Sequence, residues 1–309
     1  MRQQNLNSIT RDNDAPQLSI IIAVCGDVRV VRCLSALTSQ TIDQNRFEII
    51  VVENGTNLFE DICKDARVVY LNLSLASMPL ARNAGLRAAS GDIVLFTDAD
   101  CVANATWVET MLGCFAELPD TVGIGGAIRR YKPETVVELY GSNLVDGQDR
   151  LNYLPILPLP YVVTANAGFR RNHLLEVGGF DNELLSGNDV DICYKLGLRG
   201  YQISLCSDAI VFHENRKSVS QHFKRFFRYG TYQSLLFKKY QGVTRRKIIF
   251  DLYPLRCFKR AAVVLPRALG LMLESNWSLI WSVILLVVEG AGIFFGLLYG
   301  SVKFRTLYL

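Results

Sequence analysis

In the first third of the chain, short apolar runs alternate with segments whose apolar residues recur at helical spacing. The runs have the length and near-continuous apolar character of strands buried on both faces: Leu18–Val24, Phe47–Val52, Arg67–Leu71 and Ile93–Phe96. Helical spacing occurs over Val28–Ser39, Leu80–Ala89 and Thr106–Glu117. Such alternation predicts an α/β fold built on a mostly parallel, doubly wound sheet.

The pattern is less regular after Pro119, and residues 129–160 give no clear assignment. Strands are expected at four further runs: Val122–Ala127, Tyr161–Thr164, Gln202–Cys206 and Ala209–Phe212. A helix is expected over Asp189–Arg199, because Gly200 is a typical helix end. We therefore expect one α/β domain over residues 16–216. It follows a polar tail, residues 1–15, which has no apolar stretch of the kind found in signal peptides.

The C-terminal third has two segments of different character. Phenylalanines recur at helical spacing among lysines and arginines, which predicts a basic amphipathic segment over residues 217–275. Ser278–Gly300 carries Glu289 as its only charge. As a helix it would be roughly 35 Å long, against a hydrocarbon core of roughly 30 Å, so a transmembrane helix is predicted over 276–302. A hairpin with Ala261–Leu273 as its first arm is the alternative, although Pro266 and Arg267 make that arm a poor full span.

Charge is divided unevenly along the chain. The net charge is +4, yet the stretch from His213 to Arg267 holds fourteen Lys and Arg against two acidic residues. Solvated charge, nucleic-acid binding and an anionic membrane surface could each explain a basic stretch. The membrane explains it best, because an apolar segment follows directly, and no nucleic-acid partner is expected. The positive-inside rule then places the α/β domain in the cytoplasm at the cell membrane, with the short tail 303–309 on the far side.

The eight cysteines are scattered and include no Cys-x-x-Cys pair. The simplest interpretation is a reducing compartment in which most of them are small core residues. Near the end of the apolar segment Ser278–Gly300, three glycines recur every fourth residue: Gly292, Gly296 and Gly300. Small residues at this spacing let helices approach closely in lipid, so we expect a partner helix, from a second copy or another membrane subunit.

Two carboxylates, Asp98 and Asp100, follow the central apolar run directly. Residues i and i+2 of a strand point to the same side, and ligands of open α/β sheets bind at the carboxyl ends of strands. Two carboxylates there repel each other unless a cation lies beside them, and a divalent ion with a diphosphate on its far side would meet that need. The alternative is a solvated turn at the end of a strand.

Several motifs along residues 17–230 occur in an order that resembles glycosyltransferase family 2. The opening strand is Ser19-Ile20-Ile21-Ile22, and Val51-Val52-Glu53-Asn54-Gly55-Thr56 is similar to the family's turn after its second strand. The donor-side signature is similar to Ala81-Arg82-Asn83-Ala84-Gly85, Gly91-Asp92 and Asp98-Ala99-Asp100. The acceptor-side blocks are Asn166, Arg170-Arg171, Gly178-Gly179-Phe180-Asp181 and Gly187-Asn188-Asp189-Val190-Asp191, followed by His213.

This resemblance implies a GT-A fold, with a donor half over about 16–127 and an acceptor half over about 128–216. It also implies inverting transfer from a nucleotide sugar, UDP-sugar by preference, with GDP- and dTDP-sugars as alternatives. The donor nucleotide would be bound by Val24, Glu53, Arg82, Asn83, Asp92 and Asp98. Asp100 and His213 would hold Mn²⁺ or Mg²⁺.

The resemblance makes Asp189 the general base, because inverting transfer needs a carboxylate within hydrogen-bond reach of the acceptor hydroxyl. Asp191, two residues further on, is the competing carboxylate. Asn166, Arg170 and Arg171 are expected to be catalytic or acceptor-binding. Two positions depart from the family pattern: Glu53 stands where Asp is usual, and Asn188 stands where Glu is usual.

The function expected from the sequence is metal-dependent, inverting sugar transfer to a growing cell-surface or lipid-linked glycan. The alternative is a catalytically weak family member that serves as a membrane assembly subunit of a polysaccharide synthesis complex. A dinucleotide-dependent oxidoreductase is disfavoured, because Ala23-Val24-Cys25-Gly26-Asp27 replaces the glycine-rich loop that such enzymes have after the first strand.

Overall fold

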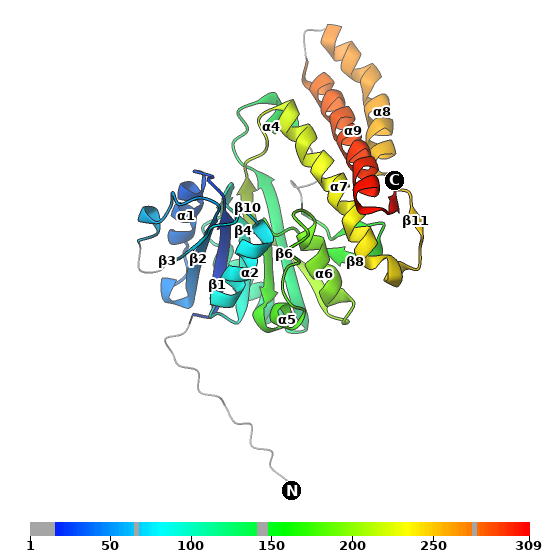
Figure 1. Cartoon of the computed structure of the whole chain (residues 1–309). Helices are drawn as coiled ribbons and strands as arrows, with labels where there is room; N and C mark the ends of the chain where they lie inside the picture. Colours follow the sequence, from blue (N-terminus) through cyan, green and yellow to red (C-terminus); the bar gives the residue numbers. More distant parts are fainter. Residues whose placement is uncertain (1–15, 65–67, 141–147, 274–276) are drawn as a thin grey trace.

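A computed structural model of the chain describes residues 16–64, 68–140, 148–273 and 277–309. The predicted polar tail, 1–15, and the predicted start of the third strand at Arg67 lie outside these residues. The core is an eight-stranded sheet with the order β3-β2-β1-β4-β9-β6-β10-β5 (Figure 1). Its strands are β1 (Leu18–Val24), β2 (Phe47–Asn54), β3 (Val68–Leu73), β4 (Ile93–Asp98), β5 (Cys101–Ala103), β6 (Thr121–Arg130), β9 (Asn166–Arg170) and β10 (Gln202–His213).

The first four strands of this order are parallel, as the sequence predicts. The apolar run of β1 is buried along its whole length, because helices cover both faces of the sheet. Ile20 and Ile22 pack with α1 (Val30–Thr38) and α3 (Trp107–Glu117). Ile21 and Ala23 point the other way, toward α2 (Met78–Ala88), α5 (Arg171–Glu176) and α6 (Asn188–Gly197). The doubly wound, mostly parallel architecture is therefore confirmed.

Two strand predictions in the second half need correction. The run Tyr161–Thr164 is not a strand beyond its first residue: β8 (Leu157–Tyr161) pairs with β7 (Asn152–Leu154), and β9 begins only at Asn166. The two short strands expected over residues 202–212 form one strand, β10. An irregularity in register between Cys206 and Ile210 lets β10 stay paired with β6 along both parts.

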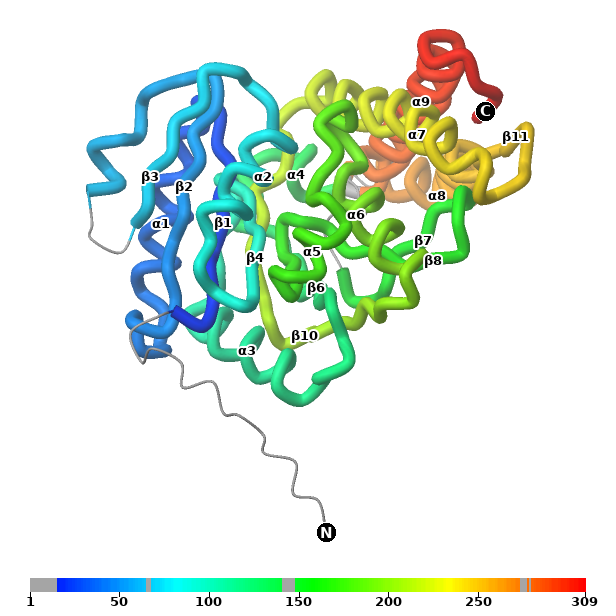
Figure 2. Tube along the Cα trace, turned by 60° about the horizontal axis from the view of Figure 1, so that its bottom comes forward, coloured from blue at the N-terminus to red at the C-terminus, as the bar shows by residue number. Residues whose placement is uncertain are grey.

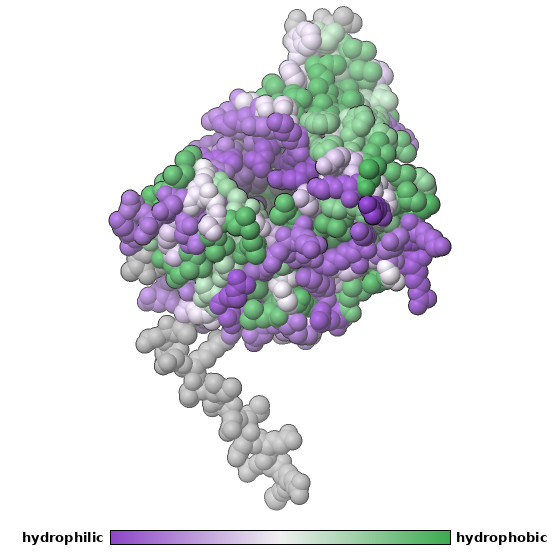
Figure 3. Space-filling view, in the orientation of Figure 1, coloured by the Kyte–Doolittle hydropathy of each residue, from purple (hydrophilic) through white to green (hydrophobic). Residues whose placement is uncertain are grey.

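Three long helices follow the sheet: α7 (Val219–Thr244), α8 (Tyr253–Leu273) and α9 (Ser278–Phe304). α7 begins at Ser218, whose hydroxyl accepts a hydrogen bond from the backbone N–H of Gln221 at 3.3 Å. α8 and α9 lie side by side and project from the body (Figure 1). A stretch of α9, Leu279–Phe304, is the one helix of the described residues that is long and apolar enough to cross a membrane. Apolar side chains gather over the projecting pair (Figure 3).

The segments that flank this helical hairpin meet at its base. β11 (Ile248–Ile249) precedes α8 and pairs with β12 (Leu307–Tyr308), which follows α9. The backbone N–H of Leu309 also donates to the carbonyl of Ile249 at 3.0 Å. A single crossing by residues 276–302 would put these two segments on opposite sides of a membrane. The structure therefore favours the hairpin alternative, and the side on which tail 303–309 lies stays a prediction.

The glycine-lined face of α9 is already covered within the chain. Both views show α9 running along α7 (Figures 1 and 2). A Cβ built at Gly296 would overlap the carbonyl oxygen of Phe227, and one at Gly300 would lie 2.5 Å from that of Thr231. The helix partner expected for Gly292, Gly296 and Gly300 is thus α7 of the same chain, rather than a second copy or another subunit.

Glu289, the only acidic residue of α9, is buried where α7, α8 and α9 meet. Its carboxylate accepts a hydrogen bond from the hydroxyl of Tyr253 on α8. The Nε2 atom of His222 on α7 lies 3.9 Å from the other carboxylate oxygen. These polar partners offset the cost of burying a carboxylate in an apolar helix bundle.

The structure joins Cys114 of α3 to Cys206 of β10 in a disulfide, with their Cα atoms 6.3 Å apart. The sequence analysis expected free thiols in a reducing compartment, and this pair departs from that expectation. The two cysteines are 92 residues apart, and only the packing of α3 against the sheet brings them together. Cys33, Cys63, Cys101, Cys193 and Cys257 are free and buried, as expected for small core residues.

Candidate active site

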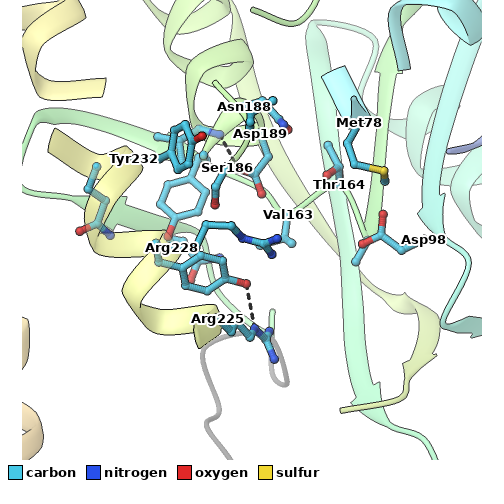
Figure 4. A pocket seen from close by; sticks show the side chains of 18 of the residues that line it. Met78, Asp98, Val163, Thr164, Ser186, Asn188, Asp189, Arg225, Arg228 and Tyr232 are labelled. Carbon is cyan, nitrogen blue, oxygen red and sulfur yellow. Dashed lines mark hydrogen bonds between the residues drawn. The ribbon is translucent and has the colours of Figure 1, made fainter. Parts of the chain in front are cut away.

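A cavity of about 930 Å³ opens at the carboxyl ends of β1 and β4. Its walls include three parts of the fold that are distant in sequence. Val24, Asp98 and Asp100 lie at the strand ends, Asn188 and Asp189 lie on α6, and Arg225 and Arg228 lie on α7 (Figure 4). The strand-end carboxylates and the α6 carboxylate, which the sequence analysis assigned to donor and acceptor chemistry, therefore face one space.

Arg82 connects the donor side of the cavity to α6. Its Nη2 donates to Asp98 Oδ1 at 3.0 Å, and its Nη1 donates to Asn188 Oδ1 at 2.7 Å. The guanidinium of Arg82 thus forms an ion pair with the strand-end carboxylate of Asp98. Because Asn188 still offers an oxygen acceptor, its departure from the family pattern leaves this contact to Arg82 in place.

Asp100 lies almost completely buried among cationic groups. Its carboxylate is 3.4 Å from Arg29 Nη2, 3.8 Å from Arg216 Nη1 and 3.6 Å from His213 Nε2. Burial raises the pKa of Asp100, and the charges of Arg29 and Arg216 oppose that rise. Asp100 and His213 meet because β5 pairs antiparallel with β10, with Cys101 opposite His213.

The side chains of Asp100 and His213 suit a divalent cation whose remaining coordination positions are filled by a bound ligand. The carboxylate of Asp100 and the imidazole of His213 are close enough to share one ion. The described residues contain no group of three or more His, Cys, Asp or Glu side chains that could hold a metal on their own. Mg²⁺ in particular is commonly bound by one or two carboxylates together with substrate phosphates and water. The residues present therefore suit a cation held jointly with a diphosphate.

Asp189 and Asp191 have different surroundings although they share the first turn of α6. Asp189 lines the cavity, and burial raises its pKa against the opposing charge of Arg82. Asp191 points into the protein, where it accepts a hydrogen bond from Tyr240 Oη at 2.8 Å. Lys239 Nζ and Lys195 Nζ lie 2.7 and 3.2 Å from its carboxylate. Of the two carboxylates, only Asp189 opens onto the cavity.

The carboxylate of Glu53 binds the loop that follows β2, and it does not line the cavity. The carboxylate is fully buried and accepts hydrogen bonds from Leu58 N at 2.7 Å, Phe59 N at 3.0 Å and Tyr70 Oη at 2.7 Å. Burial acts to raise its pKa, but these bonds and one from Thr56 lower it overall. A contact between this carboxylate and a nucleotide would have to displace the loop.

Two other residues proposed for the donor site lie elsewhere. Asn83 fixes the loop before α6: its amide accepts from Phe180 N and donates to Phe180 O, both at 2.8 Å. Asp92 is exposed just before β4, at the end of that strand opposite Asp98. Its backbone carbonyl accepts a hydrogen bond from the N–H of Arg171.

The three acceptor-side candidates outside α6 also lie away from the cavity. Asn166 is buried, accepts a bond from Trp107 Nε1 at 2.8 Å and donates to the carbonyls of Ala127 and Ala209. Arg170 donates to the carbonyls of Thr121, Phe115 and Pro119. Arg171 starts α5, beside Asp92. These residues hold strands and helices together.

The wall opposite Asp98 was not foreseen. It is formed by α7 and by residues 150–155, with aromatic and cationic side chains that include Arg225, Arg228, Tyr229 and Tyr232 (Figure 4). The signal in the sequence was the basic and aromatic pattern of α7, which we attributed to a membrane surface.

Comparisons with known proteins agree with this geometry. The sequence profile of glycosyl transferase family 2 matches residues 19–178, just over half of the chain. The chain is 29% identical over 233 residues to glycosyltransferase AglE of Haloferax volcanii, covering 70% of this chain and 72% of AglE. It is 33% identical over 155 residues to the pre-mycofactocin glycosyltransferase of Mycobacterium tuberculosis, where the match covers 48% of this chain and 33% of that protein.

Two further matches extend over more of the chain. The glucosyl-dolichyl phosphate glucuronosyltransferase of Haloferax volcanii is 23% identical over 280 residues, which is 84% of either protein. The structure of the mannosyltransferase PcManGT from Pyrobaculum calidifontis, solved with GDP-Man and Mn²⁺, matches with a TM-score of 0.61 at 16% identity. That match covers 93% of this chain and 87% of PcManGT, and it confirms the expected GT-A-like fold. The chain belongs to glycosyltransferase family 2.

Proposed function

We propose that the chain is a metal-dependent, inverting glycosyltransferase that moves a sugar from a nucleoside-diphosphate sugar to a glycan acceptor. The observation that carries the proposal is that Asp98, Asp100 and Asp189 line one cavity. Transfer of a sugar between two substrates needs a leaving-group site and a base in one enclosed space. This cavity offers both, from different elements.

On the donor side, Asp100 and His213 would hold Mn²⁺ or Mg²⁺ together with the donor diphosphate. When bound, the cation would offset the negative charge that develops on the leaving diphosphate. Arg82 is held toward the cavity by Asp98 and Asn188. Its guanidinium can therefore reach a phosphate without first being ordered. The binding of GDP-Man and Mn²⁺ by PcManGT supports the metal and the diphosphate, although we favour UDP as the nucleotide.

On the acceptor side, Asp189 would remove the proton of the attacking hydroxyl. The carboxylate faces the cavity, and its raised pKa makes it a stronger base than an exposed aspartate. We favour Asp189 over Asp191, because the carboxylate of Asp191 is held by Tyr240, Lys195 and Lys239. The alternative is a catalytically weak assembly subunit. Asn188 does not favour it, because that residue keeps its contact with Arg82.

We also propose that the protein acts at the cell membrane, with the catalytic domain, residues 16–216, on the cytoplasmic side. The α8–α9 hairpin would enter the membrane from that side, and exposed basic residues near its base would face anionic headgroups: Arg245, Arg246, Lys259 and Arg260. From Arg260 to Leu273, α8 is about 20 Å long, so the hairpin reaches about one leaflet. Disulfides are typical of oxidising compartments, so the Cys114–Cys206 pair makes the side of the membrane a point for experiment.

The first prediction tests the metal site. Asp100→Asn should remove the part of nucleotide binding that depends on Mn²⁺, because an amide is a poorer ligand than a carboxylate for a hard cation. Thermal unfolding with UDP, GDP, dTDP or CDP, each with and without Mn²⁺, measures this, since a ligand at about 100 times its Kd stabilises by about 2.7 kcal/mol. Asp208→Asn, an exposed change on β10 outside the cavity, is the control. An unchanged Mn²⁺-dependent shift in folded Asp100→Asn would refute the metal role.

A further inference from the structure

Arg228 is a cation that the donor chemistry does not use. The residue lies on α7 and lines the cavity, and its side chain extends toward Asp189 (Figure 4). Within the described ranges of the chain, Arg228 has no hydrogen bond or ion pair. Arg150, on the adjoining loop, also lines the cavity and has no such partner among the described residues. An arginine that lines a cavity without a carboxylate suits an anionic ligand.

The donor side already has its own cations. Arg82 contacts Asp98, and Arg29 and Arg216 lie beside Asp100. A diphosphate bound between Asp98 and Asp100 would meet these groups first. Arg228 comes from α7, on the wall across from Asp98, in the same region of the cavity as Asp189 (Figure 4). The anion that Arg228 suits is therefore part of the acceptor.

The cavity also extends from Asp189 to the base of the helical hairpin. Its lining includes Leu236 of α7, Tyr253 and Arg256 of α8, and Ile293 of α9. On α7, residues 225, 228, 229, 232, 233 and 236 share one stripe, so cationic, aromatic and apolar side chains follow one another along this wall. A ligand that places an anion near Asp189 therefore has a path toward the hairpin. Leu236, Tyr253 and Ile293 line it, together with the polar side chains of Gln233, Asp251 and Arg256.

We infer that Arg228, with Arg150, forms a subsite for the phosphate of a lipid-linked acceptor whose apolar chain runs toward the base of the α8–α9 hairpin. The inference rests on the proposed transferase function and names its acceptor class. The hydroxyl that Asp189 deprotonates would belong to the group attached to, or the sugar next to, that phosphate. Arg228 would then position the acceptor without contacting the donor.

The test uses the full-length protein in nonionic detergent without a donor. Binding of polyprenyl monophosphate is compared with binding of polyprenol of the same chain length, geranyl phosphate and inorganic phosphate. Wild-type protein should prefer polyprenyl monophosphate to all three. Arg228→Gln should weaken binding of polyprenyl monophosphate by about 10- to 100-fold, the usual range for a lost hydrogen bond to a charged group. Binding of polyprenol should not change.

Two variants accompany Arg228→Gln. Lys224→Gln removes an exposed charge one turn earlier on α7, outside the cavity, and should leave every affinity unchanged. Arg228→Lys keeps the charge but loses the planar pair of donors, so it should retain part of the affinity. An equal loss for Lys224→Gln would show a general charge effect and would overturn the subsite.

Other outcomes separate this inference from the proposed function. If Arg228→Gln lowers affinity for UDP or GDP with Mn²⁺ instead, Arg228 belongs to the donor site and the inference fails. If inorganic phosphate binds as tightly as the polyprenyl probe, the site recognises free phosphate and the lipid assignment fails. If wild-type protein binds no nucleotide but discriminates the lipid phosphate through Arg228, the proposed transferase fails while the subsite stands.

Discussion

Asp189 and Asp191 are two residues apart, yet the structure gives them different surroundings. Asp189 faces the cavity, whereas Asp191 is held by Tyr240 and two lysines in the protein interior. Sequence spacing alone put both carboxylates in the first turn of a helix, where either could have been the base. The difference arises from α7, which brings Lys239 and Tyr240 to Asp191 from about fifty residues further along the chain.

Substitution of the two carboxylates should therefore give opposite results. Asp189→Asn should keep nucleotide binding and lose about 10²- to 10⁴-fold in transfer rate, the usual contribution of one general base. Asp191→Asn should keep the rate of the folded enzyme and lower the free energy of unfolding by about 2–3 kcal/mol, because two partly exposed lysines lose their counterion. Product formation and thermal unfolding measure the two effects. A rate defect confined to Asp191→Asn would assign the base to that residue.

The raised pKa of Asp189 gives a signed pH dependence. The base must be ionised, so transfer should fall as the pH drops through this pKa, at a higher pH than for an exposed aspartate. For stability, a carboxyl whose pKa is raised in the folded state favours folding at low pH, and this contribution is lost as the pH rises through the folded pKa. Asp189→Asn should therefore raise Tm at neutral pH. A lower Tm for this variant at pH 7, or an unshifted acid limb of kcat/KM in wild-type protein, would contradict the assignment.

Other residues show where sequence patterns inform the site and where they do not. Asp98 and Asp100 could be placed from sequence, because a buried strand followed by carboxylates at i and i+2 fixes their position at the sheet edge. Glu53 and Asn166 match family motifs, but hydrogen bonds to their own surroundings keep both out of the cavity. Arg228 was missed because a cationic residue on a basic helix carries no local signal of which way it points.

At the scale of elements, the apolar runs predict the central parallel strands. They do not predict how the later strands extend the sheet. β9 lies antiparallel between β4 and β6, and β10 runs between β6 and β5. These pairings depend on contacts far apart in sequence, whereas periodicity reports only on local burial. Likewise, the glycine spacing of α9 predicts a close helix contact, and only the fold shows that α7 provides it.

The α7–α9 contact should be intolerant of any side chain at Gly296. Gly296→Ala should lower the free energy of unfolding by about 1–3 kcal/mol, because its Cβ would overlap the backbone of α7 and force the helices apart. Gly242→Ala is the matched control on α7, since a Cβ there meets nothing within 4 Å. The control should be stabilised by about 0.5–1 kcal/mol through reduced backbone entropy of the unfolded chain. Thermal unfolding in detergent measures both variants. Equal changes in the free energy of unfolding for Gly296→Ala and Gly242→Ala would contradict the close contact between α7 and α9.

At the scale of the whole molecule, the α8–α9 pair has a part that packs on the body and a part that projects from it. The C-terminal part of α9 packs on α7 as part of the body, while the rest pairs with α8 in the projecting hairpin. The exposed apolar side chains of the hairpin include Val263, which is 71% exposed, and Ile284, which is 37% exposed. Hydropathy alone could not distinguish this hairpin from a single crossing, because the pairing of β11 with β12 that favours the hairpin involves two residues at either end.

The hairpin predicts both lipid binding and its geometry. Val263→Lys with Ile284→Lys should reduce flotation with anionic vesicles, because each charge would have to enter the hydrocarbon at a cost of several kcal/mol. Val28→Lys changes a residue that is 69% exposed on the body and should leave flotation unchanged.

A tag after Leu309 should be cleaved by protease on the same side of the membrane as the catalytic domain, because the tail is hydrogen-bonded to the segment before α8. Protection of the tag from protease on that side would contradict the hairpin and support a single crossing.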